Sequence, residues 1–489
     1  MKKLVTILGL VVLAHAAHSQ NPLQWQQIYG GAGVEVGYGV RSCLDQGYIV
    51  VGTTSGAGPS DGYVVRTDSL GLVMWSKFYG GVNIDIIRAV ELLPDSGFIM
   101  AGYSNSGGHG GYDGWLIRTD KNGDTLWTRY VGTSDWDFFY DVECTRDGGF
   151  LCAGGTYGPG AGDEDMYLVR FNPTGDTLWT KTYGGARVDE ARGVIETEDS
   201  LIAICGFTYS FADTLGDSWL LRLDIDGDTT WTHTLGDLNA EDRAYGLCYD
   251  SVFDIILYCG YSMATNLGEG YWEGVYYDDT TWFTFYGTGP QDFDEFYSIK
   301  TKAALGPFAA VGTTFSQGAG FGDMWLFSSI QAWIFTSYGT VMEDHAYDFD
   351  FTHDGGYILC GSTTGYNSFV PNMYLVKGDT NMASTTFVGV PEISSTGGSS
   401  FVAAFPVPAN SSLSFTMVFD AASTSDIFIE IIDITGKVIA VVPNEEIYFP
   451  DGHHGSAATN TTSFVPGIYM YSLKNSSGTM YSDKFIISR

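Results

Sequence analysis

The sequence predicts an all-β fold, a seven-bladed β-propeller followed by a small Ig-like β-sandwich. A tryptophan recurs about every 51 residues, a period typical of propellers and solenoids. Each repeat carries four runs of strand length, enough for one propeller blade, and no window shows a sustained helical period. The repeated tryptophans are Trp25, Trp75, Trp127, Trp179, Trp231, Trp282 and Trp333.

The four runs are clear in the first complete repeat, where they read "GVRSCLD", "GYIVVGT", "DGYVVRTD" and "LVMWSKFYGG". Their β-branched and aromatic residues favour strands, and the Gly, Asp and Asn residues between them favour turns. The second run ends at a glycine in all seven repeats, namely Gly52, Gly102, Gly154, Gly206, Gly260, Gly312 and Gly361.

The two ends of the repeat region predict how the ring closes. The first tryptophan run, "LQWQQIYGG", has no three strands before it, and the last repeat has no tryptophan run after "NMYLVKGDT". The first run can therefore supply the outer strand of the last blade, which leaves no open sheet edge. We expect a closed propeller over residues 22–380. The alternative, an open solenoid, would need terminal caps, and we see none in the sequence.

Residues outside the repeats predict export. Lys2 and Lys3 precede an apolar run from Leu4 to Ala14, and small residues follow up to Ser19, which is typical of a signal peptide over residues 1–19. This run is too short to span a bilayer, and no later stretch is long enough, so we expect no membrane span. Residues 381–400 contain few large apolar residues and are expected to form a linker.

The charge of the chain excludes one class of partner. It has 57 acidic and 23 basic residues, a net charge of −34. Such a surface repels nucleic acid phosphates and anionic membranes, and it suits solubility and cation binding. We therefore expect no nucleic acid partner, and we expect a monomer.

Most of the seven cysteines are expected to be small core residues. Cys205, Cys259 and Cys360 occupy one repeat position, where the other repeats have Val51, Ala101, Ala153 and Val311. A position that accepts only these residues is a cramped core site. Cys144 and Cys152 could face each other across a hairpin, which makes them a disulfide candidate.

The loop "TDKNGDTLW" allows two interpretations. Asp, Asn and Gly favour a hairpin turn between the third and fourth strands. Oxygen-rich side chains at alternate positions could also bind calcium, although the spacing departs from the twelve-residue calcium loop and later repeats lose the acids. We favour the turn. The calcium candidates are Asp120, Asn122 and Asp124, and Asp224, Asp226 and Asp228; no other cofactor is expected.

A carboxylate recurs five residues before a core position of the first strand in all seven repeats. In a propeller the first strand lines the central channel, so these acids would form a ring at the channel mouth. We favour a structural role in which each acid caps its own loop, with basic residues of the third strands (Arg66, Arg118, Arg170, Arg222 and Lys377) available as partners. The alternative is a cation site or a polar contact ring. The acids are Glu35, Asp85, Asp137, Asp189, Asp242, Asp294 and Asp344.

Residues 401–489 show strand-like alternation and predict a small antiparallel β-sandwich. Pro406, Pro408, Ala409 and Asn410 precede a turn at Asp433, Gly436 and Lys437, a strand entry at Pro466, Gly467 and Tyr469, and a final strand with Lys484. This segment resembles the C-terminal sorting domain of proteins exported by the type IX secretion system (the Por secretion system) of Bacteroidota, except that Val407 replaces the usual Asn. The resemblance implies export through the periplasm, recognition by the outer-membrane secretion machinery, and a secreted or cell-surface location.

The sequence contains no H-E-x-x-H, G-x-x-x-x-G-K-[ST] or C-x-x-C motif. Three hypotheses follow, and the ligand stays unknown in each. The first is an exported, non-catalytic binding or adhesion protein for a glycan or protein ligand. The second is a secreted glycan-active enzyme that uses the channel mouth, and the third is a structural surface-layer component. Since propellers include both enzymes and binding proteins, the fold alone does not choose among them.

Overall fold

The computed structural model describes most of the repeat region and most of the C-terminal region. The described residues are 23–31, 33–56, 59–158, 160, 162–211, 215–236, 240–251, 254–263, 269–275, 281–286, 293–302, 308–315, 322–329, 334–340, 342–365, 370–379, 401–405, 412–418, 427–433, 437–447, 454–465, 467–475 and 478–487. The expected signal peptide and linker lie outside these residues.

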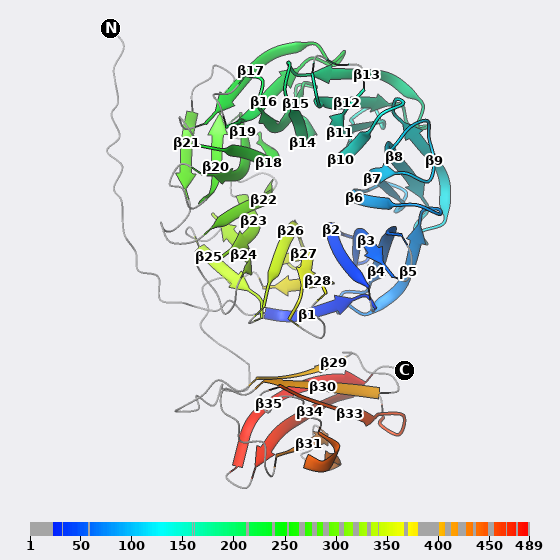
Figure 1. Ribbon diagram of the computed structural model, residues 1–489, viewed down its shortest axis with the longest axis vertical. Coiled ribbons are helices and arrows are strands. Elements are labelled where there is room, and N and C mark those ends of the chain that lie inside the picture. Colours follow the sequence, from blue (N-terminus) through cyan, green and yellow to red (C-terminus); the bar gives the residue numbers. More distant parts are fainter. Residues whose placement is uncertain are drawn as a thin grey trace, which may run out of the picture.

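Within the described residues, the repeats form seven four-stranded antiparallel sheets arranged around a ring (Figure 1). The inner strands are β2 (Val34–Ser42), β6 (Asp85–Leu92), β10 (Asp137–Cys144), β14 (Asp189–Glu196), β18 (Asp242–Asp250), β22 (Asp294–Thr301) and β26 (Asp344–Phe351). The second strands are β3 (Tyr48–Ser55), β7 (Phe98–Ser104), β11 (Phe150–Thr156), β15 (Ile202–Thr208), β19 (Ile255–Ser262), β23 (Phe308–Thr314) and β27 (Tyr357–Thr363).

Two further strands complete each sheet. The third strands are β4 (Asp61–Thr67), β8 (Asp113–Thr119), β12 (Asp165–Phe171), β16 (Asp217–Leu223), β20 (Glu269–Val275), β24 (Asp323–Ser328) and β28 (Asn372–Gly378). The outer strands are β5 (Val73–Tyr79), β9 (Thr125–Val131), β13 (Thr177–Tyr183), β17 (Thr229–Leu235), β21 (Thr281–Tyr286), β25 (Ile334–Tyr338) and β1 (Leu23–Tyr29).

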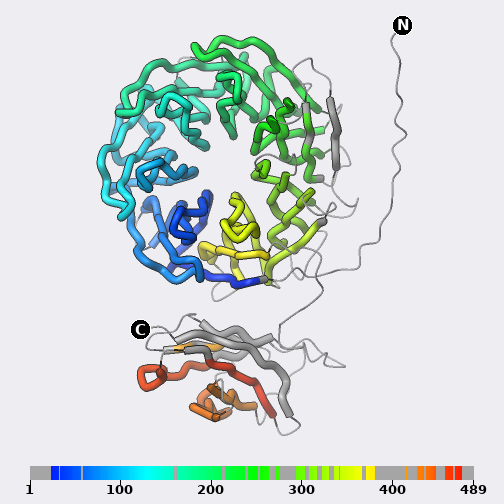
Figure 2. The backbone as a smooth tube through the Cα atoms, turned by 180° about the vertical axis from the view of Figure 1, so that it is seen from behind, coloured from blue at the N-terminus to red at the C-terminus, as the bar shows by residue number. Residues whose placement is uncertain are grey.

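The ring closes as the ends of the repeat region predict. Strand β1 pairs antiparallel with β28, with Trp25 opposite Lys377 and Tyr29 opposite Met373. Figure 2 shows this strand, in dark blue, against the yellow sheet formed by the last repeat. The last sheet thus receives its outer strand from the beginning of the repeat region, and the prediction of this pairing is confirmed.

The apolar core lies between neighbouring sheets. One cluster joins Ile49 and Val51 of β3 to Ile87 of β6 and Met100 of β7, all at most 1% exposed. Because the second and third strands are covered on both faces, they are almost continuously apolar.

The cysteines are free thiols, and six of the seven are buried. Cys205, Cys259 and Cys360 lie in the core, as the repeat pattern predicts. The disulfide prediction is wrong: Cys144 pairs in register with Phe150, and Cys152 pairs with Val142. The two cysteines therefore do not sit opposite each other on the hairpin.

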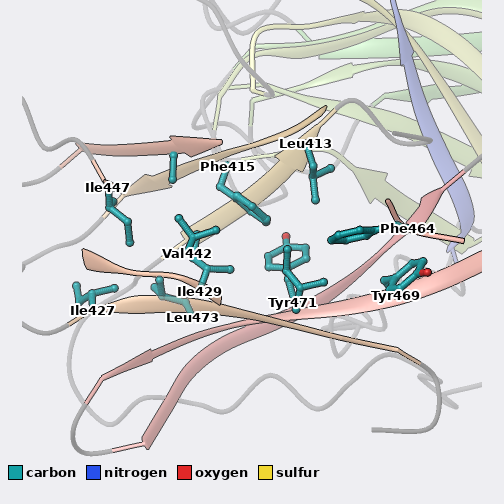
Figure 3. Close-up of a cluster of buried hydrophobic side chains, with 12 residues drawn as sticks. Leu413, Phe415, Ile427, Ile429, Val442, Ile447, Phe464, Tyr469, Tyr471 and Leu473 are labelled. Carbon is teal, nitrogen blue, oxygen red and sulfur yellow. The ribbon is translucent and has the colours of Figure 1, made fainter. Parts of the chain in front are cut away.

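The C-terminal region is a β-sandwich. One sheet has the order β29 (Phe401–Phe405), β30 (Ser412–Val418), β33 (His454–Asn460), and the other has the order β32 (Val438–Val442), β31 (Phe428–Asp433), β34 (Gly467–Asn475), β35 (Gly478–Ile487). A single 3-10 turn, η1 (Asn444–Glu446), follows β32. Leu413 and Phe415 of one sheet pack against Ile429, Tyr471 and Leu473 of the other (Figure 3). The described residues contain no helix long and apolar enough to cross a membrane.

Candidate functional site

Each inner strand has one register irregularity, and it falls at the same position in all seven sheets. The residue at this position has no register partner on the second strand, which is the arrangement of a β-bulge. A bulge redirects its side chain, and here the seven side chains, all half-buried, line a central channel of about 530 Å³. We call these residues the Tyr/Arg ring: Tyr38, Arg88, Tyr140, Arg192, Tyr245, Tyr297 and Tyr347.

The members of the Tyr/Arg ring contact one another around the whole channel. The Arg88 guanidinium lies 4.1 Å from the centroid of the Tyr38 ring and 5.4 Å from that of Tyr140. Arg192 lies 4.4 Å from Tyr140 and 5.7 Å from Tyr245. The aromatic centroids continue the circle at 5.0 Å for Tyr245–Tyr297, 5.1 Å for Tyr297–Tyr347 and 5.5 Å for Tyr347–Tyr38. Such cation–π and aromatic contacts hold each side chain in place before any ligand arrives.

The two arginines of the ring differ in their partners. Arg192 forms an ion pair with Glu190. The Arg88 side chain has no ion pair or hydrogen bond with any residue that the structure describes. The ring thus contains one cation without a counter-ion among the described residues.

Burial raises the pKa of four ring tyrosines, Tyr140, Tyr245, Tyr297 and Tyr347, above the ordinary value of a phenol. Burial raises the pKa of Tyr245 to about 12 despite Arg192, and burial together with Tyr38 raises that of Tyr347 to about 12. The Tyr297 hydroxyl donates a hydrogen bond to Glu295. Burial raises the pKa of Glu295 to about 7, although this hydrogen bond acts to lower it. The ring therefore offers phenol hydroxyls that both donate and accept.

A charged layer follows further along the inner strands. Its members are Arg41, Glu91, Asp141, Glu143, Lys300, Asp348 and Asp350. Burial disfavours ionisation of Asp348, but Lys300 and Arg41 outweigh burial and lower its pKa to about 2. Burial raises the pKa of Asp141 to about 6, although the backbone N–H of Val194 donates to it at 2.9 Å.

The seven repeated acids lie elsewhere. All are at most 4% exposed at the start of the inner strands, and none is among the described residues that line the channel. Their place around the channel mouth, with a structural role, therefore stays a prediction. Glu35 is the second residue of β2, and each of the other six acids is the first residue of its inner strand.

Loop donors surround several of these carboxylates. The Gly81 N–H donates to Asp85 at 2.7 Å, and the Thr133 N–H donates to Asp137 at 2.6 Å. Four donors reach Asp189: the N–H of Gly185 at 2.8 Å, the hydroxyl of Ser210 at 2.6 Å, the N–H of Ser210 at 3.3 Å and the hydroxyl of Thr208. Asp344 accepts from the Thr340 N–H at 2.5 Å, Asp294 from the Phe315 N–H at 3.0 Å, and Glu35 from the Thr54 hydroxyl at 3.0 Å. Asp242 is equally buried.

The basic residues of the third strands have other partners than expected. Each forms an ion pair with an acid of the turn between the first and second strands, at the opposite end of the sheet. The pairs are Arg66–Asp45, Arg118–Asp95, Arg170–Asp147, Arg222–Asp199 and Lys377–Asp354.

The calcium candidates lie in hairpin turns. Asp120 accepts the N–H groups of Asn122 and Asp124, both at 2.8 Å, and Asp224 accepts those of Asp226 at 3.0 Å and Asp228 at 2.8 Å. No group of three or more His, Cys, Asp or Glu in the described part of the chain is arranged to hold a metal ion.

The same turns join neighbouring sheets. Lys77 pairs with Asp124 at 2.5 Å and Lys181 with Asp228 at 2.7 Å, in each case from the outer strand of the preceding sheet. The Tyr79 hydroxyl donates to the Gly123 carbonyl at 2.6 Å.

The sorting motif is described in part. The N–H of Lys437 donates to an Asp433 side-chain oxygen at 3.1 Å and closes the turn between β31 and β32. Gly467 begins β34 and Lys484 lies in β35. Pro406, Pro408, Asn410, Gly436 and Pro466 lie outside the described residues.

Comparisons with known proteins show what each part resembles. Residues 403–488 match the family model of the secretion system C-terminal sorting domain. No curated protein shows a significant match to the chain. Similar solved structures include Sqt1 from Chaetomium thermophilum (12% identity, TM-score 0.42, 70% of this chain and 83% of that one) and the polysaccharide lyase Uly1 (11% identity, TM-score 0.45, 72% and 92%). Another is the β-propeller domain of the Trilobed protease from Pyrococcus furiosus (12% identity, TM-score 0.41, 75% and 99%). The chain thus carries a sorting domain and is a secreted or cell-surface protein.

Proposed function

We propose that this exported chain is a non-catalytic binding or adhesion protein and that the Tyr/Arg ring holds its ligand. The observation that carries the proposal is the continuity of the ring: every inner strand contributes one aromatic or guanidinium group to the same level of the channel. The apolar cores lie between neighbouring sheets, so the packing of the sheets does not require a bulge that turns a side chain into the channel. Seven such bulges at the same position therefore indicate another role.

The chemistry of the ring suits ligand binding. The channel volume falls within the range of small-molecule and ligand-end sites, about 300–1,000 Å³. Aromatic faces supply contact area at low conformational cost, and the phenol hydroxyls and Arg88 supply directional hydrogen bonds. Because the side chains are already fixed by each other, little entropy is lost when a ligand binds.

Delivery belongs to the same proposal. Residues 1–19 would direct the chain across the inner membrane as a signal peptide, and residues 401–489 would be recognised by the type IX outer-membrane machinery. The partner of the propeller itself is a glycan or protein met outside the cell.

One observation favours the second candidate, a glycan-active enzyme. Glu295 is 8% exposed, has a pKa of about 7 because of burial, and contacts the channel through Tyr297. A carboxyl group with such a pKa can serve as a general acid at neutral pH.

The test compares binding and turnover with the full chain. A glycan array and a pull-down from extracellular fractions are run with the wild type, Tyr297→Ala and Tyr249→Phe. Tyr249 is half-buried at the far end of β18, where its hydroxyl donates to Asp254 at 2.6 Å, and it serves as the control. The proposal expects a ligand that the control retains and Tyr297→Ala loses. A ligand consumed by the wild type but not by Glu295→Gln would favour the enzyme, and identical profiles for all variants would favour a structural role.

A further inference from the structure

A row of aromatic side chains leads from the surface to the Tyr/Arg ring. It lies on the β6–β9 and β10–β13 sheets, which are neighbours in the ring (Figure 1), at the end where the inner strands begin. We call it the aromatic track, made of Trp136, Tyr157, Tyr112, Phe138, Tyr103 and Tyr140.

The contacts along the track are continuous. The Trp136 ring lies 5.9 Å from Tyr157 and 6.4 Å from Phe138, and Phe138 stacks on Tyr140 at 6.0 Å with an interplanar angle of 11°. Its outer end is open, because Trp136 is 52% exposed and Tyr157 is 41% exposed. A contiguous group of exposed aromatic side chains is typical of an interaction site.

The outer end of the track is held in place by its own backbone. Gly111 lies against the Trp136 ring, and a β-carbon there would come within 2.1 Å of it. The Gly111 N–H donates to the Asp135 carbonyl at 3.0 Å, and the Tyr157 N–H donates to the Trp136 carbonyl at 2.8 Å. The track is therefore preorganised, which lowers the entropic cost of binding.

At its inner end the track meets charge. Tyr140 lies between Arg88 and Arg192, and Glu190 neutralises Arg192. Burial and the neighbouring Glu190 raise the pKa of Glu164, beside Tyr157, to about 7. Arg88 is thus a local exception to the net charge of −34: an acidic group in direct contact with it is attracted, whereas repulsion from distant surface carboxylates is screened by salt. A guanidinium without a partner suits a carboxylate or sulfate, which it binds through two parallel hydrogen bonds.

Building on the proposed function, we propose that the aromatic track and Arg88 bind a polysaccharide chain that carries carboxylate or sulfate groups. Its sugar rings lie on the track, and an acidic substituent reaches Arg88. The C–H faces of a sugar ring carry partial positive charge and stack on the negative faces of aromatic rings. The packed rings of the aromatic track form one continuous surface of ring faces and edges, which suits a row of sugar rings. A peptide ligand would instead need separate pockets for its anchor side chains.

The test uses the full chain and isothermal titration calorimetry. The probes are hexasaccharides of mannuronate, of galacturonate and of a sulfated galactan, with a neutral galactan hexasaccharide and hexaglutamate for comparison. At least one acidic saccharide should bind about tenfold more tightly than the neutral one, and Arg88→Gln and Trp136→Ala should each weaken that binding about tenfold.

Two control variants share the face but not the track. Arg187→Gln removes an exposed arginine that lies 5.3 Å from the Tyr209 ring. Phe211→Ala removes an aromatic residue that is 53% exposed. Both should bind like the wild type.

Several results would overturn the inference. They are equal binding of the neutral saccharide, equal or tighter binding of hexaglutamate, no binding of any acidic saccharide, or loss in the controls as large as in Arg88→Gln and Trp136→Ala. The carboxylate and sulfate probes separate the two acidic groups. If another ligand is found that requires Tyr297 but neither Trp136 nor Arg88, the proposed function stands and this inference fails.

Discussion

Arg41 Nη1 lies 2.6 Å from Asp348 Oδ2, an ion pair that joins the first inner strand, β2, to the last, β26. The same carboxylate oxygen accepts the Val40 N–H at 3.1 Å, and the other carboxylate oxygen pairs with Lys300 at 3.0 Å. The ring is therefore closed twice, by the β1–β28 ladder at its outer rim and by this charge cluster at the channel.

Replacing Asp348 with Asn should lower the free energy of unfolding by about 3 kcal/mol at pH 7, because it removes the counter-charge of Lys300 and leaves Arg41 paired with Glu91 alone. The pKa of Asp348 is about 2 in the folded chain, below the value of about 3.9 for a free Asp. Its contribution is thus fully present above about pH 4 and is lost as the pH falls through 2. Urea unfolding of the wild type and the variant should show curves that converge in acid.

Asp124→Asn provides the control for Asp348. It removes a surface ion pair with Lys77, in which Asp124 is 73% exposed, and should cost less than about 1 kcal/mol. A loss as large as that of Asp348→Asn, or an Asp348→Asn effect that persists below pH 2, would contradict the assignment.

The turn glycines give a second prediction. Gly123 has φ +75° and lies against the Trp75 ring of the preceding sheet, so that a β-carbon would come within 2.7 Å of it. Gly123→Ala should therefore lower the free energy of unfolding by about 1–2 kcal/mol, because alanine is strained in the left-handed conformation. It should lower it further because the new β-carbon displaces the Trp75 ring at the contact between the two sheets. Gly148 has φ +81° with only Pro173 nearby, at 3.7 Å. Gly148→Ala should lower the free energy of unfolding only by the cost of the left-handed conformation. Equal decreases of the melting temperature for the two variants would disprove the role of Trp75.

The sequence predicts the sheets well because their signals are local and repeated. Trp25 and its run, lacking strands before them, suffice to place β1 on the last sheet. The Tyr/Arg ring was missed although its members recur three residues after each repeated acid. A strand has a side-chain period of two, and this period gives no sign that Tyr38 or Arg88 leaves the ladder as a bulge. The partners of Arg66 and Lys377 were missed because sequence spacing does not tell which end of a strand a long side chain reaches.

The sorting domain gives a third prediction. Deleting residues 401–489 should leave the propeller in the periplasm, because the segment matches a secretion sorting domain. Tyr471→Ala should have the same effect, since Tyr471 is 1% exposed between the two sheets (Figure 3) and its truncation costs about 3–5 kcal/mol. Val441→Ala, at a side chain that is 51% exposed, should be exported normally. Cell fractionation and immunoblotting measure the result, and surface delivery of the deleted chain would refute the role of the domain.

The last prediction decides between the two interpretations of the repeated acids. Four hydrogen-bond donors occupy the two carboxylate oxygens of Asp189. Asp189→Asn replaces one of these oxygens with an NH2 group, so it should lower the free energy of unfolding by about 1–3 kcal/mol even when no metal is present. Asp226→Asn, in an exposed turn, should cost much less. Calcium should leave the melting temperature of the wild type and both variants unchanged, because oxygens already used by N–H and O–H donors have no lone pairs directed at an ion. Calorimetry with calcium and with a chelator measures this. If calcium instead stabilises the wild type as RT ln(1 + [L]/Kd) and Asp189→Asn abolishes the gain, these carboxylates hold a cation and the capping role is wrong.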